Sequence, residues 1–260
     1  MNNDTRPIGF FDSGVGGTTV WHAVHQLLPY ENTLFYADSL NAPYGQKSVD
    51  EIISLSHKNV QLLLKNNVKI IIVACNTATT NAITDLRNTY NLPFVGIEPA
   101  IKPAAISTLT KAVGVLATQG TLTSKKYTQA QILHPQIKFI NQIGYGIVQL
   151  IEAGKLYSDE MKNLLKSYVL PMMEHNIDHL VLGCTHYPYL TPILKEILPN
   201  TVQIVDSSMP VAQRTKKILQ DNNLLKTDNN IGYSKFYSNK DPEILQSFIK
   251  NFGIAEKLSF

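Results

Sequence analysis

The sequence contains little arginine and little charge of either sign. Only Arg6, Arg87 and Arg214 are arginines among 260 residues, and charged residues make up 17%, below the quarter that is usual for globular chains. The 23 basic and 20 acidic side chains leave a net charge of +3, and the basic residues are scattered. Because no basic stripe stands out, we expect no nucleic-acid partner.

Long apolar runs are also absent. The longest pure run, residues 70–75, has the length of a strand and falls far short of the roughly 18 residues that a membrane span needs. The first residues lack the charged and then apolar layout of a signal peptide. We therefore expect a soluble, cytoplasmic protein with no membrane partner.

Cysteine is scarce as well, since only Cys75 and Cys184 are present. In a reducing cytoplasm we expect both to be thiols rather than a disulfide. Two cysteines are too few for a Cys-rich structural zinc site. No motif for a metal, pyridoxal phosphate, a flavin or a nucleotide stands out, so we expect neither metal nor cofactor.

Strand-like and helix-like segments alternate along the chain, with short loops between them. Strands are expected at residues 8–11, 33–37, 69–74, 94–97, 112–117, 137–141, 179–182 and 202–205. Helices are expected at residues 18–28, 76–90, 48–66, 100–109, 124–133, 147–152, 158–175 and 210–222. This alternation predicts an α/β fold with mostly parallel sheets.

The two halves of the chain resemble each other around the two cysteines. In each half a buried strand runs into a cysteine and small polar residues, V-A-C-N-T at 73–77 and L-G-C-T-H at 182–186. We expect two pseudo-symmetric lobes, each a mostly parallel sheet flanked by helices, with the active site in the cleft between them. The first lobe is predicted to comprise residues 1–97 and a returning segment, 211–260, and the second to comprise residues 98–210.

Polar residues follow several predicted strands, where ligands bind in open parallel sheets. They are Asp12, Asp38, Cys75 and Cys184. Asp12 opens D-S-G-V-G-G at 12–17, a glycine-rich turn before a helix, whose free backbone N–H groups favour an anion. The third glycine of the turn does not stand where a dinucleotide fingerprint needs it, and no G-K-[ST] of a phosphate loop follows. A plain tight turn is the alternative interpretation.

The two cysteine sites suggest acid–base chemistry at a carbon atom. One thiolate could take a proton from one face of the carbon while the other thiol donates a proton to the opposite face. Asp12, Glu152 and His186 are candidate assistants that could hold or shuttle the thiol protons. The alternative is that both cysteines are ordinary buried apolar residues at strand ends.

An acidic substrate would be held without arginine, because no arginine falls in these loops. Backbone N–H groups at helix N-termini would hold the carboxylates of such a substrate. Small polar side chains would complete the binding site: Ser13, Asn76, Thr77, Thr118, Thr121 and Thr185.

Five short motifs are spread along most of the chain. They are F-D-S-G-V-G-G at 11–17, P-Y-G at 43–45, A-C-N-T-A at 74–78, A-T-Q-G-T at 117–121 and G-C-T-H-Y-P at 183–188. Through them the sequence resembles the glutamate racemases of the cofactor-independent aspartate/glutamate racemase superfamily. The resemblance implies interconversion of L- and D-glutamate without pyridoxal phosphate or metal, a homodimer, and a bacterial source in which D-glutamate feeds peptidoglycan synthesis.

The resemblance also implies roles for single residues. Cys75 would take the α-proton of D-glutamate with help from Asp12, and Cys184 would take that of L-glutamate with help from Glu152 and His186. The implied substrate-binding residues are Asp12, Ser13, Pro43, Tyr44, Gly45, Cys75, Asn76, Thr77, Thr118, Thr121, Cys184, Thr185 and His186. Some relatives carry a longer N-terminal extension tied to activation by a cell-wall precursor, and since seven residues precede the first predicted strand, we expect no such activation.

Two other functions stay open at this point. A relative with another substrate, such as an aspartate racemase, would differ in the length of its pocket, which one sequence does not reveal. A non-catalytic carboxylate-binding or regulatory protein is the second alternative, since some members of the family bind DNA gyrase. The presence of both cysteines favours catalysis over a purely binding role.

Overall fold

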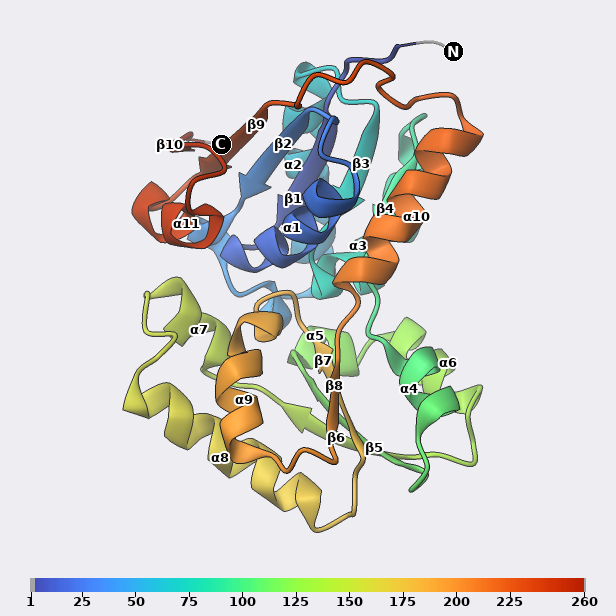
Figure 1. Cartoon of the computed structure of the whole chain (residues 1–260), viewed down its shortest axis with the longest axis vertical. Coiled ribbons are helices and arrows are strands. Elements are labelled where there is room, and N and C mark those ends of the chain that lie inside the picture. The colour runs from blue at the N-terminus through green and yellow to red at the C-terminus, as the bar shows by residue number, and fades with distance from the viewer. Residues whose placement is uncertain (1–2, 260) are drawn as a thin grey trace.

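A computed structural model describes residues 3–259, and its first lobe is built on a six-stranded parallel sheet with the strand order β10-β9-β2-β1-β3-β4. Residues 1–2 and 260, the outer ends of the predicted first lobe, lie outside the described residues. The strands are β1 (Ile8–Asp12), β2 (Thr33–Ala37), β3 (Ile70–Val73), β4 (Phe94–Gly96), β9 (Ser234–Ser238) and β10 (Ala255–Lys257). This sheet therefore joins segments from both ends of the chain (Figure 1).

The second lobe is built on a four-stranded parallel sheet with the strand order β6-β5-β7-β8. Its strands are β5 (Ala112–Ala117), β6 (Lys138–Ile143), β7 (His179–Gly183) and β8 (Gln203–Val205). The two sheets lie one above the other along the long axis of the molecule (Figure 1). Two lobes of parallel strands flanked by helices confirm the predicted fold class, whereas the predicted residue boundaries of the lobes stay a prediction.

Helices cover both sheets. In the first lobe they are α1 (Thr18–Leu27), α2 (Val49–Lys65), α3 (Asn76–Thr89), α10 (Ser208–Asp221) and α11 (Pro242–Ile249). In the second lobe they are α4 (Ile101–Ser107), α5 (Gln119–Leu122), α6 (Lys125–Ile132), α7 (Ile147–Glu152), α8 (Asp159–Met173) and α9 (Thr191–Ile197). Short 3₁₀ turns, η1 (Val15–Gly17), η2 (Ser39–Asn41), η3 (Tyr44–Gln46) and η4 (Tyr187–Leu190), lie in the connecting loops.

The local sequence explains why these elements form where they do. Ile70–Val73 is entirely buried, as expected for a β-branched run in a strand that helices cover on both faces. Ser48 caps α2 by accepting a hydrogen bond from the backbone N–H of Glu51, which satisfies one of the free donors at the helix start. Cys75 caps α3 in the same way, because its Sγ accepts from the N–H of Ala78 at 3.4 Å.

The returning C-terminal segment is held to the first lobe by strand pairing and by a hydrogen bond to a buried ion pair. β9 pairs with β2 along its whole length, with Ala37 opposite Ser238. Just before β2, the carboxylate of Glu31 lies 2.6 Å from Nζ of Lys69 and accepts the N–H of Lys226 from the C-terminal segment at 2.8 Å. The pair is buried, so removing either partner would leave an uncompensated charge.

Most predicted elements agree with the structure to within a few residues. The strands at 33–37 and 112–117 and the helix at 147–152 match residue for residue. The sequence analysis did not predict α5, α9 or the pairing of β9 and β10. Within residues 3–259, no helix has both the length and the apolar character needed to cross a bilayer.

Candidate active site

The carboxyl ends of both parallel sheets meet at the junction of the lobes. Asp12 ends β1 and Cys75 follows β3 in the first lobe, whereas Thr118 follows β5 and Cys184 follows β7 in the second. Hydrogen bonds across the junction, from Val15 to the second lobe among others, show that these strand ends belong to one site. Open α/β sheets bind ligands at such strand ends because the chain there turns into helix N-termini.

Asp12 connects the first lobe to the second. Its Oδ1 accepts the N–H of Ser13 at 2.7 Å and its Oδ2 accepts the N–H of Gly17 at 2.5 Å. Oδ2 also accepts the hydroxyl of Thr185 from the other lobe at 3.2 Å. Burial raises the pKa of Asp12 to about 6, although the positive charge of His186 and the Gly17 N–H act in the opposite direction.

Cys75 is buried, and within residues 3–259 no charged side chain hydrogen-bonds to its sulfur. Its thiol lies 3.5 Å from Oγ of Ser13, within hydrogen-bond range for sulfur, and its Sγ accepts the N–H of Ala78. Burial, and to a smaller extent the negative charge of Asp12, raises the pKa of the Cys75 thiol above its ordinary value. The resting thiol is therefore protonated and needs help to lose its proton.

Cys184 has an imidazole and a carboxylate as neighbours. Its Sγ lies 3.8 Å from Nδ1 of His186, and Nε2 of the same ring lies 2.6 Å from Oε1 of Glu152. Burial lowers the pKa of His186, but the contacts with Cys184 and Glu152 outweigh it and raise that pKa well above its ordinary value. His186 can therefore hold a proton between the thiol and the carboxylate.

The glycine-rich turn of the first lobe packs directly against this pair. The N–H of Val15 donates to Oε1 of Glu152 at 2.6 Å. A Cβ on Gly14 would lie 1.9 Å from Oε1 of Glu152, and one on Gly16 would lie 2.2 Å from Nδ1 of His186. Only glycine lets the backbone of this turn approach Glu152 and His186 of the other lobe so closely. The turn therefore forms part of the contact between the lobes and is not simply a connection between a strand and a helix.

Small polar side chains line the remaining junction. Thr118 Oγ1 lies 2.8 Å from Oγ1 of Thr77 and 2.9 Å from Oγ1 of Thr121, which joins the start of α3 to the start of α5. Gly45 packs against Thr118, since a Cβ there would lie 2.7 Å from Cβ of Thr118. Asn76 is buried, and neither its Oδ1 nor its Nδ2 finds a hydrogen-bond partner among the described residues.

An unpartnered buried amide is costly unless a ligand or water pairs with it. Asn76 is the first residue of α3, beside Cys75, where a bound carboxylate or ammonium group would meet it. The amide of Asn76 is therefore available to pair with a polar ligand or a water molecule close to one of the two thiols.

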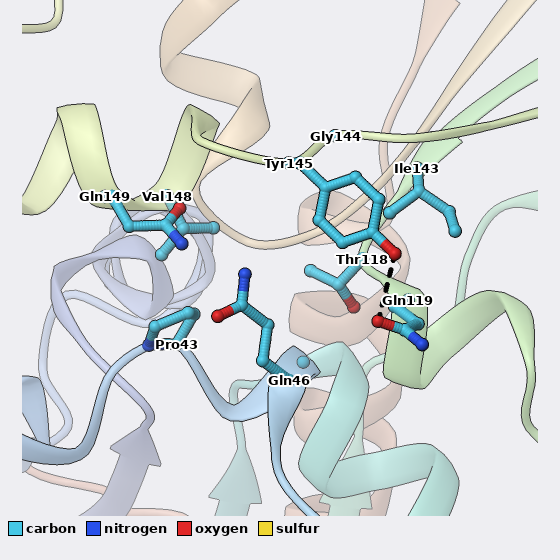
Figure 2. A pocket seen from close by; sticks show the side chains of 10 residues that line it. Pro43, Gln46, Thr118, Gln119, Ile143, Gly144, Tyr145, Val148 and Gln149 are labelled. Carbon is cyan, nitrogen blue, oxygen red and sulfur yellow. Dashed lines mark hydrogen bonds between the residues drawn. The ribbon is translucent and has the colours of Figure 1, made fainter.

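A small cavity of about 20 Å³ lies between the lobes beside this junction. Figure 2 shows the side chain of Gln46 extending between Pro43 on one side and Thr118 on the other, with Val148 and Gln149 of α7 across the space. Tyr145 borders the same space, and its hydroxyl donates to Oε1 of Gln119 at 3.1 Å. A second cavity of about 150 Å³ lies on the other side of Pro43, between Glu152 and Lys240.

The sequence pattern that defines the Asp/Glu/hydantoin racemases matches residues 19–214, well over half of the chain. The chain belongs to the Asp/Glu/hydantoin racemase family. The glutamate racemase of Herpetosiphon aurantiacus is 39% identical over 238 residues, which cover 91% of this chain and 94% of that protein.

Solved structures of the family have the same architecture. The glutamate racemase of Bacillus anthracis superposes with a TM-score of 0.88 at 29% identity, over 98% of both chains. The Escherichia coli glutamate racemase, crystallised with L-glutamate and the activator UDP-MurNAc-Ala, superposes with a TM-score of 0.85 at 31% identity, again over 98% of both chains. The two-lobed fold of this racemase is thus that of its relatives.

The structure brings the residues singled out in the sequence to one junction. Cys75, Asp12 and Ser13 form one wall, and Cys184, His186, Glu152 and Thr185 form the other, while Asn76, Thr77, Thr118 and Thr121 lie at the helix starts beside them. Pro43 and Gly45 line the small cavity. Tyr44 is buried and donates its hydroxyl to Asp38.

Both cysteines of this racemase are free thiols, as predicted, and both are buried. Among residues 3–259, no group of three or more His, Cys, Asp or Glu side chains is arranged to hold a metal ion. Gln46, Gln149 and the asparagines around Asp38 were missed by the sequence analysis, because they are ordinary polar residues outside the recognisable motifs. The position of Asp38 at a strand end was the available signal for its network.

Proposed function

We propose that this racemase interconverts L- and D-glutamate by moving the α-proton between two thiols, without a cofactor. The observation that carries the proposal is the pair of buried free thiols at facing strand ends, each with its own acid–base neighbour. The relatives named as glutamate racemases, and the E. coli relative bound to L-glutamate, support the choice of substrate.

In the direction from L-glutamate, the thiolate of Cys184 takes the proton from Cα and leaves the electron pair on the α-carbon. The Cys75 thiol then gives its own proton to the opposite face of the same carbon, which yields D-glutamate. Cys184 ends as a thiol and Cys75 as a thiolate, so the reverse reaction begins with Cys75. His186 with Glu152 would hold the proton exchanged with Cys184, and Asp12 would serve Cys75 in the same way.

Substrate binding would rest on neutral hydrogen-bond donors. The negative charge that develops on the substrate carboxylate would be stabilised by N–H groups at the start of α3 and by nearby hydroxyls. The residues proposed to contact glutamate are Asp12, Ser13, Pro43, Tyr44, Gly45, Cys75, Asn76, Thr77, Thr118, Thr121, Cys184, Thr185 and His186. Asn76 is the best supported of the neutral groups, because its buried amide lacks a protein partner within the described residues.

We further propose that the enzyme acts in the cytoplasm as a homodimer and that its D-glutamate serves peptidoglycan synthesis. This proposal rests on the resemblance to the glutamate racemases. Size-exclusion chromatography with light scattering would test the dimer, and restored growth of a D-glutamate auxotroph would test the biosynthetic role.

The direct test uses purified protein, D-glutamate and deuterated water, with a chelator present and no cofactor added. We expect the circular dichroism of the amino acid to decay to zero while deuterium enters at Cα. A variant with both cysteines changed to serine serves as the control for contaminating racemases. Activity with aspartate alone would show that the substrate is wrong, and silence with both amino acids would favour a binding or regulatory role.

A further inference from the structure

Two neighbouring strands of the first lobe end side by side and bring distant residues together. β9 pairs with β2 in parallel, and Ala37 lies opposite Ser238 at the carboxyl end of the pair. The next residues along the two strands are Asp38 and Asn239, and the N–H of Asn239 donates to the carbonyl of Ala37 at 3.3 Å. Figure 1 shows β9 beside β2 in this lobe, with the red C-terminal segment continuing outward.

The side chain of Asn239 uses both of its polar atoms on the turn after β2. Its Nδ2 donates to Oδ1 of Asp38 at 2.5 Å, and its Oδ1 accepts the N–H of Leu40 at 2.8 Å. Only 7% of the residue is exposed, so water does not readily replace these bonds. Asn239 therefore fixes the position of Asp38 from a segment about two hundred residues later in the chain.

Asp38 in turn fixes Tyr44. The Tyr44 hydroxyl donates to Oδ2 of Asp38 at 2.5 Å, and Nδ2 of Asn41 donates to Oδ1 of Asp38 at 2.8 Å. Nδ2 of Asn59 donates to the Tyr44 hydroxyl at 3.2 Å. All these donors are neutral and buried or partly buried, so the network depends on geometry rather than on ion pairing.

Tyr44 lies next to the Cys75 half of the site. Both residues belong to the same buried hydrophobic cluster of the first lobe. Burial, the negative charge of Asp38 and the hydrogen bond to that carboxylate raise the pKa of Tyr44 well above its ordinary value, which keeps its hydroxyl a donor. The following residue, Gly45, contacts Thr118 of the second lobe. A displacement of this turn would therefore also move the lining of the cavity between the lobes.

We propose that Asn239 is a positioning residue for the Cys75 half of the reaction, acting through Asp38 and Tyr44. The inference rests on the proposed function, because it assumes that Cys75 exchanges the proton on the D-glutamate side. Among the described contacts, this network has no counterpart at Cys184. The groups beside that sulfur, His186 and Glu152, come from the second lobe. Loss of Asn239 should therefore slow proton transfer at Cys75 more than at Cys184.

Rates alone cannot reveal such one-sidedness. The two enantiomers have equal free energies, so the equilibrium constant is one and kcat/KM must be the same in both directions. Isotope effects on kcat/KM escape this constraint, because deuterium at Cα is removed by Cys75 from D-glutamate and by Cys184 from L-glutamate. The isotope effect grows for the step that becomes rate-limiting and shrinks for the other.

The experiment compares Asn239→Ala and Asn239→Asp with the unchanged chain, using each enantiomer with hydrogen or deuterium at Cα. Asn239→Asp keeps the size of the side chain and an acceptor for Leu40 but loses the donor to Asp38. Asn251→Ala is the matched control, because Asn251 is exposed on the same returning segment. We expect kcat/KM to fall at least about tenfold in both Asn239 variants, the rate equivalent of one lost hydrogen bond to a charged group.

The isotope effects decide between positioning and simple loss of folded protein. We expect a larger effect than in the unchanged chain with deuterated D-glutamate and a smaller one with deuterated L-glutamate, in both Asn239 variants but not in Asn251→Ala. Partial unfolding would lower the amount of active enzyme and leave both isotope effects unchanged, which would overturn the proposal. Equal shifts for both enantiomers, or kcat/KM within about twofold of the unchanged chain, would overturn it as well.

The unchanged chain separates this inference from the proposed function. If it racemises glutamate and the Asn239 variants show no one-sided isotope shift, the positioning role is wrong and the function stands. If the unchanged chain does not exchange the α-proton of glutamate, the proposed function fails first.

Discussion

The Cys75 wall and the Cys184 wall present the same nucleophilic atom in different settings. At Cys75 the sulfur meets a hydroxyl from Ser13 and a backbone N–H, and at Cys184 it meets His186, which is paired with Glu152. Both cysteines follow a strand in the interior of a parallel sheet. The repeated strand and loop therefore position the two sulfurs alike, whereas the residues around them differ in chemistry.

This difference sets the resting charges of the site. Burial and Asp12 raise the pKa of Cys75, and the contacts of His186 raise the pKa of that imidazole despite its burial. The thiol of Cys75 is thus neutral in the resting site, whereas beside Cys184 the imidazole of His186 can carry a proton. The proposed reaction would therefore use two unlike acid–base groups, although it has the same efficiency in both directions.

The largest expected effect comes from the sulfurs themselves. Cys75→Ser and Cys184→Ser should each reduce racemisation of both enantiomers by about 10³-fold or more, because a hydroxyl is a far weaker base than a thiolate. Circular dichroism of L- and D-glutamate measures the loss. A single variant that keeps the turnover of the unchanged chain would remove that wall from the mechanism.

The next effect sharpens the contrast between the assistants. His186→Gln and Glu152→Gln should lower kcat/KM between about 10²-fold and 10³-fold, because the proton store beside Cys184 is lost. Ser13→Ala should cost about tenfold, since it removes one neutral hydrogen bond near Cys75. If Ser13→Ala proved as damaging as His186→Gln, the two walls would not differ as the structure indicates.

The pH dependence of stability isolates the buried carboxyl of Asp12. Its folded-state pKa of about 6 exceeds the ordinary 3.8, so the folded chain binds more protons than the unfolded chain between these values. The unfolding free energy of the unchanged chain should therefore rise, relative to Asp12→Asn, as pH falls from 7 to 4, by at most about 3 kcal/mol. Urea unfolding at several pH values measures the difference.

Glu196→Gln is the control for this pH series. Glu196 is on the surface, and its hydrogen bond with Lys162 lowers its pKa, so any effect should be small and of opposite sign. A stability difference between Asp12→Asn and the unchanged chain that stays flat with pH would contradict the raised pKa of Asp12.

A last pair of variants separates the junction from the interior of one lobe. Gly16→Ala places a Cβ against His186 of the other lobe and should lower kcat/KM about tenfold by holding the lobes apart, with little change in stability. Gly17→Ala places a Cβ 2.7 Å from Cβ of Asp12 within one lobe and should lower the unfolding free energy by about 1–3 kcal/mol. Thermal unfolding and steady-state kinetics on both variants test the distinction. If both variants lost the same stability and the same kcat/KM, the junction and the interior of the lobe would not differ.

The elements that sequence analysis predicted well carry their signal locally. The buried run of Ile70–Val73, the cap at Ser48 and the small polar residues after each cysteine all lie within a few residues of what they determine. The residues proposed for the site were singled out because they sit in short motifs at strand ends. Their roles came from resemblance, since periodicity alone does not separate a catalytic thiol from a buried one.

The elements that were missed depend on distant partners. The order β10-β9-β2 requires the C-terminal segment to return to the first sheet, and no local pattern in residues 234–238 states which edge it joins. The same is true of Asn239, whose chemistry becomes meaningful only beside Asp38. An asparagine after a strand is an ordinary sequence feature until a second strand end lies next to it.

An α/β chain with two similar halves, two thiols at strand ends and a site poor in arginine follows from the amino-acid sequence alone. Only the folded chain shows that Val15 donates to Glu152 across the lobes and that His186 connects Cys184 to that carboxylate. The same holds for the buried amide of Asn76 beside Cys75, which has no hydrogen-bond partner within residues 3–259. Hydrophobic periodicity and caps act over a few residues and are written in the local sequence. Hydrogen bonds and pKa shifts depend on which groups exclude water from each other, and only the folded chain sets those distances.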